Sequence, residues 1–393
     1  MSLTQTMAKD SNRAAFPAEG LVVFLLCMAT YGVFIVFIFI ANGLRSAAFA
    51  AAIIGTAFAL LKFRPEWQKK LSDMIGRQKV AVAAAVVISV LSYPVLLAWN
   101  PYWIHIMTVV FIYAIMAQGV NIHLGEMGAI NVGYAGFFAI GTYAAAILLV
   151  AGYPFWIAML AAVIACWLAG AFLGACVVRT TGDYLALVTL GFGFIVYQLV
   201  INMEWLTRGP DGIGNIPKPN LLGHSFGAPL SLGFTTLPKE ANFYYLALVL
   251  LALCVALVWQ AKRSWIGRIW SATRQDSLGV SCFGVNVPWM RVFSFAFGAA
   301  FGGVAGALYA SEIGFVSPEE FTIFLSITVI SMVILGGMAN WWGVLVGSLI
   351  LIVLPEKLRE FAEYRLLLYG IVLLLLLIYR PHGLFPSNSR RYE

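Results

Sequence analysis

Apolar runs recur along the whole chain and are separated by short polar segments. A run of about 20 apolar residues can cross a bilayer as a helix. We therefore predict an all-α, polytopic helical membrane protein with about 10–12 transmembrane or re-entrant helices, several of them shorter than a full crossing. The predicted segments are 20–41, 47–61, 80–98, 104–121, 130–150, 155–178, 184–202, 242–261, 292–311, 322–336, 342–354 and 366–379.

The composition excludes a large soluble protein. Of the 393 residues, 62% are hydrophobic and only 10% are charged, and soluble helices need a polar face that these runs lack. The first run, 21–41, is too long for the apolar part of a signal peptide, so we expect a retained helix.

The basic residues are distributed unevenly over the predicted loops. If the chain starts in the cytoplasm and alternates sides, 17 Lys and Arg residues fall inside and seven fall outside. This bias predicts that both termini are cytoplasmic. The net charge of +7 is then a topology signal, and we expect no nucleic acid partner.

An amphipathic segment follows the second predicted helix. Phe63, Trp67, Leu71 and Met74 recur at helical spacing among basic residues, as in a helix that lies on the cytoplasmic membrane surface. We assign residues 1–99 to an N-terminal extension with about three transmembrane helices and this interfacial segment.

Glycines at four-residue spacing indicate close helix packing. Gly298, Gly302 and Gly306 share one helix face, and Gly170 and Gly174 share another. The five cysteines are scattered without paired spacing, so they predict neither a disulfide framework nor a metal site.

The segment NIHLGEMGAINVGYAGFFAIGTY (121–143) is unusually polar and rich in glycine. Glycines weaken a helix, and non-helical backbone at membrane depth survives only inside protein or beside a wet cavity. We therefore predict a helix break on the translocation path. The candidate path residues here are Gly125, Glu126, Asn131, Gly133, Tyr134 and Gly141.

Three ionisable residues leave alternatives open. Glu126 lies near the predicted cytoplasmic interface, where a solvated side chain is favoured over one that lines the path. His105 is interpreted as an interfacial anchor rather than a proton relay, and Glu312 as an exposed loop acid rather than a gate. Neither acid has a basic partner at helical spacing, which argues against proton coupling.

Four short motifs occur in order along the second part of the chain. They are GDYLALVTLGFG (182–193), GPDGI (209–213), SPE (317–319) and RPHGL (380–384). Residues 100–387 thereby resemble the LivM-type membrane subunit of branched-chain amino acid ABC importers. The resemblance implies a type II-like importer permease core at 100–387, with 388–393 as a cytoplasmic tail, and adds Asp183, Tyr184 and Thr189 to the candidate path. In that family the residue after Gly125 is usually small or hydroxylated, so Glu126 is a departure.

The resemblance also implies a set of partners in a bacterial inner membrane. These are a second homologous permease, two ATPase subunits and an extracytoplasmic binding protein. No lysine follows a glycine, so the chain lacks a GxxxxGK[ST] phosphate loop, and ATP is expected to bind to the partner subunits. We expect no enzyme activity, catalytic residue, cofactor or metal in this chain.

The basic loop 267–284 lies on the predicted cytoplasmic side. The resemblance implies that it is the coupling helix, with Arg268, Arg274 and Asp276 contacting an ATPase and Gly284 turning the chain back toward the membrane. The alternative is an ordinary basic loop that holds the topology.

The resemblance favours branched-chain or other neutral amino acids as cargo. Related permeases also carry urea, short amides and small organic acids, and these remain alternatives. A stand-alone secondary carrier is the alternative from another class, although it would need ionisable coupling groups near the midplane, where this sequence has few.

Overall fold

The computed structural model describes residues 16–39, 79–180, 182–221, 224–231, 236–357, 370, 374 and 383–385. The chain divides into two compact units. The first comprises Met1–Trp103 and Pro355–Arg365, and the second comprises Ile104–Leu354 and Leu366–Glu393.

In the first unit, α2 (Phe16–Phe39) packs against α5 (Lys79–Leu96). The Tyr31 hydroxyl lies 3.4 Å from the Ser92 hydroxyl, which joins the two helices. The predicted segment 47–61 and the amphipathic segment up to residue 78 lie outside the described residues, so the interfacial helix remains a prediction.

Most of the rest of the described chain is helical, as predicted, and two short strand pairs lie before α11. Asn220 pairs with Ser225, and Leu230 pairs with Leu237, both in antiparallel register. The elements are α6 (Pro101–Val120), η1 (Asn121–Glu126), α7 (Tyr134–Val150), α8 (Phe155–Cys176), α9 (Asp183–Asn202), α10 (Glu204–Thr207), η2 (Gly209–Asp211), β1 (Asn220–Leu221), β2 (His224–Ser225), β3 (Leu230–Ser231), β4 (Thr236–Leu237), α11 (Glu240–Arg263), α12 (Trp265–Gln275), α13 (Ser277–Cys282), α14 (Val287–Ile313), η3 (Pro318–Glu320), α15 (Ile323–Gly336) and α16 (Trp341–Lys357).

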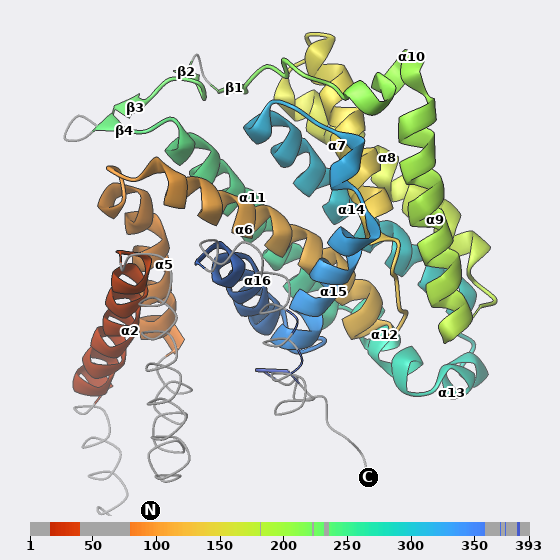
Figure 1. The fold of residues 1–393 in the computed structure, drawn as a ribbon. Helices are drawn as coiled ribbons and strands as arrows, with labels where there is room; N and C mark the ends of the chain where they lie inside the picture. Colours follow the sequence, from red (N-terminus) through yellow and green to blue (C-terminus); the bar gives the residue numbers. More distant parts are fainter. Residues whose placement is uncertain are drawn as a thin grey trace, which may run out of the picture. The chain divides into compact units, whose positions relative to one another are not determined.

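Helix α14 forms the centre of the second unit, where it packs most extensively against α8 and α7 (Figure 1). The predicted glycine faces make these contacts. A Cβ on Gly170 would lie 2.6 Å from the Cβ of Ala299, and one on Gly302 would lie 3.3 Å from the Cβ of Phe137. The absence of side chains therefore lets the helix backbones approach closely, as the spacing predicted.

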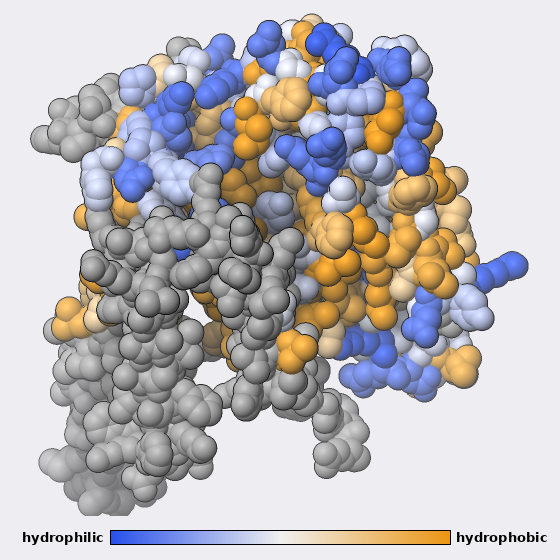
Figure 2. Space-filling model, in the orientation of Figure 1, coloured by the Kyte–Doolittle hydropathy of each residue, from blue (hydrophilic) through white to orange (hydrophobic). Residues whose placement is uncertain are grey.

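Six helical stretches in the described part are long and apolar enough to cross a membrane. Figure 2 shows apolar side chains gathered over the middle of the face that carries α9, with polar ones toward both ends. This distribution fits a multi-pass membrane protein. The stretches are Pro101–Glu126, Phe155–Cys176, Asp183–Asn202, Glu240–Arg263, Val287–Ile313 and Pro318–Gly336.

Contacts between distant segments agree with the predicted alternation of sides. A backbone bridge joins Ile213 to Val316, and both residues are predicted on the outer side. The Leu384 amide donates to the Leu335 carbonyl over 2.8 Å. Both of these residues are predicted at the cytoplasmic side. Each contact therefore joins two segments that are predicted on the same side of the membrane.

Candidate functional site

The helix break predicted in the glycine-rich segment is present. Helix α6 passes into the π-helix η1, residues 127–133 are not helical, and α7 begins at Tyr134. Gly128 adopts a positive φ of 74°, which glycine tolerates at no steric cost. A π-helical turn is rare and often marks a functional site.

Several polar groups of the break are paired within the protein. His123 Nδ1 lies 3.0 Å from Asn131 Nδ2, and the Gly133 amide donates to Asn131 Oδ1 over 3.1 Å. The Ala339 amide donates to Asn121 Oδ1 over 2.8 Å. Side chains therefore bond to this non-helical backbone, and such internal partners are what backbone at membrane depth requires.

Glu126 is buried and ion-paired, so the solvated interpretation favoured from the sequence is wrong. The residue is 3% exposed. Its Oε1 lies 3.0 Å from Nζ of Lys262, at the end of α11, and the Ser271 hydroxyl of α12 donates to its Oε2 over 3.2 Å. Lys262 also donates to the Ala339 carbonyl. The energetic cost of burying this acid is offset by a partner that sequence spacing could not reveal.

Arg274, predicted to face an ATPase, is an exposed residue that also bonds to the break. Its guanidinium donates to the Gly125 carbonyl, and a Cβ on Gly128 would lie 2.8 Å from its Cγ. Helix α12 thus contacts the break directly through Arg274 and Ser271.

The predicted coupling loop consists of two short helices, α12 and α13. Asp276 caps α13 by accepting from the Leu278 and Gly279 amides, both over 3.0 Å. Arg268, Arg274 and Asp276 are all exposed. Gly284 has a positive φ of 77°, which fits the predicted turn before α14.

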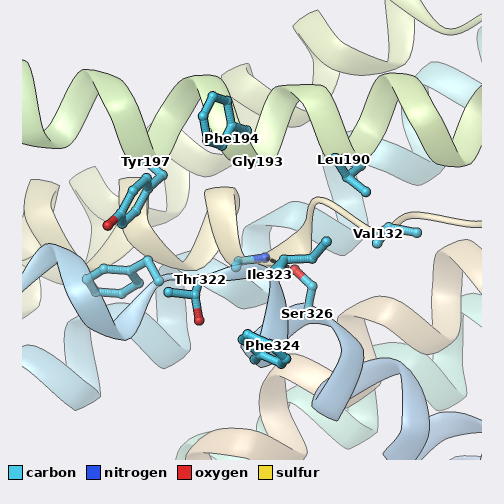
Figure 3. Close-up of a pocket in the computed structure, with 11 residues that line it drawn as sticks. Val132, Leu190, Gly193, Phe194, Tyr197, Thr322, Ile323, Phe324 and Ser326 are labelled. Atoms are coloured by element: carbon cyan, nitrogen blue, oxygen red, sulfur yellow. Dashed lines mark hydrogen bonds between the residues drawn. The ribbon is translucent and has the colours of Figure 1, made fainter.

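A cavity of about 320 Å³ lies beside the break, between α9 and the start of α15 (Figure 3). Its wall is mostly apolar, with hydroxyls from Tyr197, Thr322 and Ser326. The Ser326 hydroxyl accepts from the Ala135 amide over 2.8 Å. An apolar wall with a few polar groups suits a small, mostly apolar ligand. The lining residues are Val132, Ala135, Leu190, Gly193, Phe194, Tyr197, Phe321, Thr322, Ile323, Phe324 and Ser326.

Thr189 connects the cavity wall to the break. Its hydroxyl accepts from the Val132 amide over 3.0 Å, and a Cβ on Gly133 would overlap its carbonyl. The Tyr134 hydroxyl donates to the Gly298 carbonyl over 2.9 Å, which holds the start of α7 on α14.

The structure brings some predicted path residues together and separates others. Gly125, Glu126, Asn131, Gly133, Tyr134 and Thr189 all contribute to the break or to its supports. Gly141 packs against Gly302 and Gly303 of α14. Asp183 and Tyr184 lie exposed at the start of α9, and none of these last three lines the cavity.

Several residues of this site were not found from the sequence. His123 and Ser326 pair with backbone or side-chain groups of other helices, and Lys262 resembled any other loop cation. Only the unusual polarity of 121–131 hinted at His123.

Comparison with known proteins decides the family. The family described as "Branched-chain amino acid transport system / permease component" matches residues 102–378. The chain belongs to this family. The permease is therefore a transmembrane transport subunit, as its fold and apolar helices also indicate.

The permease is similar to named proteins over different lengths. It is 36% identical over 363 residues to the high-affinity branched-chain amino acid transport system permease protein LivM of Escherichia coli (strain K12). This alignment covers 85% of each chain. It is 27% identical over 195 residues to the autoinducer 2 import system permease protein LsrC of Salmonella paratyphi B, covering 49% of this chain and 51% of that protein. No solved structure matches.

Proposed function

We propose that this permease carries branched-chain or other neutral amino acids across a bacterial inner membrane as a subunit of an ATP-driven importer. The observation that carries this proposal is the similarity to LivM over 85% of both chains. The proposed partners are a second homologous permease, two ATPase subunits that bind ATP, and an extracytoplasmic binding protein.

The cavity supports a neutral, partly apolar cargo. Its wall offers aliphatic and aromatic groups to a branched side chain and three hydroxyls to polar groups. Phe194 and Phe324 at its edge are 59% and 74% exposed. A second permease on this face would cover them and complete a path between the two chains.

Helices α12 and α13 are the proposed coupling element. Leu278 and Phe283 are 78% and 89% exposed, and they would dock on an ATPase. Movement of α12 would then reach the break through Arg274 on the Gly125 carbonyl and Ser271 on Glu126. A loop that only held the topology would not need these inward bonds.

Reconstitution with the partners encoded beside the permease tests this function. We expect ATP-dependent uptake of labelled leucine into vesicles, with no uptake when the ATPases are omitted. Uptake of urea, short amides or organic acids, but not of leucine, would show that the cargo is one of those alternatives. Leucine uptake without the ATPases would identify a secondary carrier instead.

A further inference from the structure

The first turn of α15 forms one wall of the cavity beside the break. Thr322, Ile323 and Ser326 lie there, opposite Phe194 and Tyr197 of α9 (Figure 3). The first amides of a helix have no acceptor within the helix. The hydroxyl of Thr322, which precedes the helix, does not cap them either. The start of α15 therefore offers N–H donors beside the cavity, together with the positive end of the helix dipole.

A buried hydroxyl in the same wall also lacks an acceptor. Ser326 is 1% exposed, and its oxygen accepts from the Ala135 amide over 2.8 Å. Its hydrogen donates to none of the described residues. Buried hydroxyl donors are nearly always paired, so this one calls for an acceptor inside the cavity. The hydroxyl and the first amides of α15 thus require the same kind of ligand group.

A second helix begins at this cavity. Helix α7 starts at Tyr134, and Val132 and Ala135 on either side of that start line the cavity. The positive ends of two helix dipoles therefore meet at one cavity, and all of its lining residues are neutral. In membrane transporters, helix N-termini at such positions bind the anionic groups of substrates.

The acids of α14 and η3 bond to other residues and do not line the cavity. Glu312 Oε1 lies 2.9 Å from His105 Nδ1, and the Glu312 side chain is only 6% exposed, so the exposed loop position expected for Glu312 is wrong. Glu320, which directly precedes Phe321 of the cavity lining, hydrogen-bonds to Tyr309. No acidic side chain in the lining therefore opposes an anion.

We infer that the start of α15 binds the carboxylate of the cargo, with the Ser326 hydroxyl and the amides of Ile323 and Phe324 as donors. This inference rests on the proposed function for its natural ligand, a neutral amino acid whose side chain contacts the apolar wall. Hydrogen bonds to a charged acceptor are about twice as strong as those to a neutral one. The cavity should therefore favour a carboxylate over an amide of the same shape.

Binding of radiolabelled 4-methylpentanoate to the full-length chain in lipid nanodiscs tests the site, with empty nanodiscs as the blank. This probe is leucine without its ammonium group. We expect saturable binding that is at least tenfold tighter than that of 4-methylpentanamide, which has the same shape but no charge. Equal affinity for the acid and the amide, or no saturable binding of the acid, would overturn the site.

Two variants assign the binding to α15. Ser326→Ala removes the hydroxyl donor and should weaken binding of the acid at least tenfold. Thr322→Asp places a carboxylate where it caps the first amides and repels the ligand, so binding should be lost while the thermal midpoint stays unchanged or rises. Thr328→Val is the matched control, because Thr328 of the same helix bonds to the Phe324 carbonyl and does not line the cavity. Undiminished binding in Thr322→Asp would contradict the inference even if Ser326→Ala fails to fold.

Competition separates this inference from the proposed cargo. Leucine should displace 4-methylpentanoate from the unmodified chain. Binding of the acid that is lost in Thr322→Asp but is not displaced by leucine would support the carboxylate site and overturn the amino acid assignment in favour of small organic acids.

Discussion

The ammonium of Lys262 lies 3.0 Å from the carboxylate of Glu126 and joins the end of α11 to the helix break. Glu126 is almost fully enclosed, whereas the Lys262 side chain keeps 35% exposure. The same lysine bonds to the Ala339 carbonyl, and Ala339 in turn bonds to Asn121. One cation therefore stabilises both ends of η1.

Removing the charge of Glu126 should destabilise the permease. Glu126→Gln leaves the lysine facing a neutral group, and we expect a loss of about 2 kcal/mol in unfolding free energy, the low end for a buried pair because Lys262 is partly solvated. Denaturant unfolding in micelles measures this. The swap Glu126→Lys with Lys262→Glu should recover part of the loss, and the exposed Glu204→Gln should cost nothing. Equal stability of Glu126→Gln and the unmodified chain would show that the pair is not stabilising.

Arg274 should transmit hydrolysis rather than dock the ATPase. We expect the Arg274→Ala permease to remain bound to its ATPases during purification. Its rate of ATP hydrolysis stimulated by the loaded binding protein should fall at least about tenfold, which corresponds to 1.4 kcal/mol. The reason is that the lost bond joins α12 to the Gly125 carbonyl. Arg268 is exposed and has no such bond to the break among the described contacts, so Arg268→Ala should instead weaken ATPase retention. If Arg274→Ala releases the ATPases, its guanidinium belongs to the docking surface.

The exposed apolar residues around α13 should contribute to ATPase binding. Burial of a leucine or phenylalanine side chain contributes about 1.5–3 kcal/mol. Leu278→Asp or Phe283→Asp should therefore weaken association of the purified permease and ATPase by about tenfold or more. Trp205→Asp is the control, because Trp205 is 80% exposed on α10, predicted to lie on the outer side. Unchanged affinity in both α13 variants would place docking elsewhere.

Glycine positions on α14 should tolerate no side chain. A Cβ on Gly303 would lie 2.6 Å from the Ala162 carbonyl oxygen, so Gly303→Leu should cost about 1–3 kcal/mol or more through overpacking. A Cβ on Gly191 of α9 meets nothing within 4 Å, and Gly191→Ala should be neutral or slightly stabilising. Thermal unfolding of both variants measures the contrast, and equal midpoints would contradict the packing of α14 on α8.

The topology prediction can be tested at two positions. In a chain with its five cysteines replaced by alanine, Asn215→Cys should react with an impermeant thiol reagent added outside the cell. A reporter fused after Glu393 should be active only in the cytoplasm. Labelling of position 215 from the cytoplasmic side alone would reverse the assigned sides.

The sequence by itself determined the class of fold and the position of the break. Long apolar runs must become helices in lipid because each backbone polar group needs an internal partner. Glycines four residues apart share a helix face by geometry alone, so the packing faces of α8 and α14 followed from their spacing. The density of glycine and polar residues at 121–133 likewise indicated backbone that could not remain a regular helix.

Only the tertiary structure decided which groups meet. Sequence spacing reveals neighbours three or four residues apart on one helix, whereas Glu126 pairs with Lys262 and Glu312 with His105 across different helices. The direction of Arg274 and the lining of the cavity by Tyr197 and Ser326 depend in the same way on how helices pack. Helix contacts in a membrane bundle are made between segments far apart in the chain, so burial and pairing of a charged side chain are properties of the packed bundle.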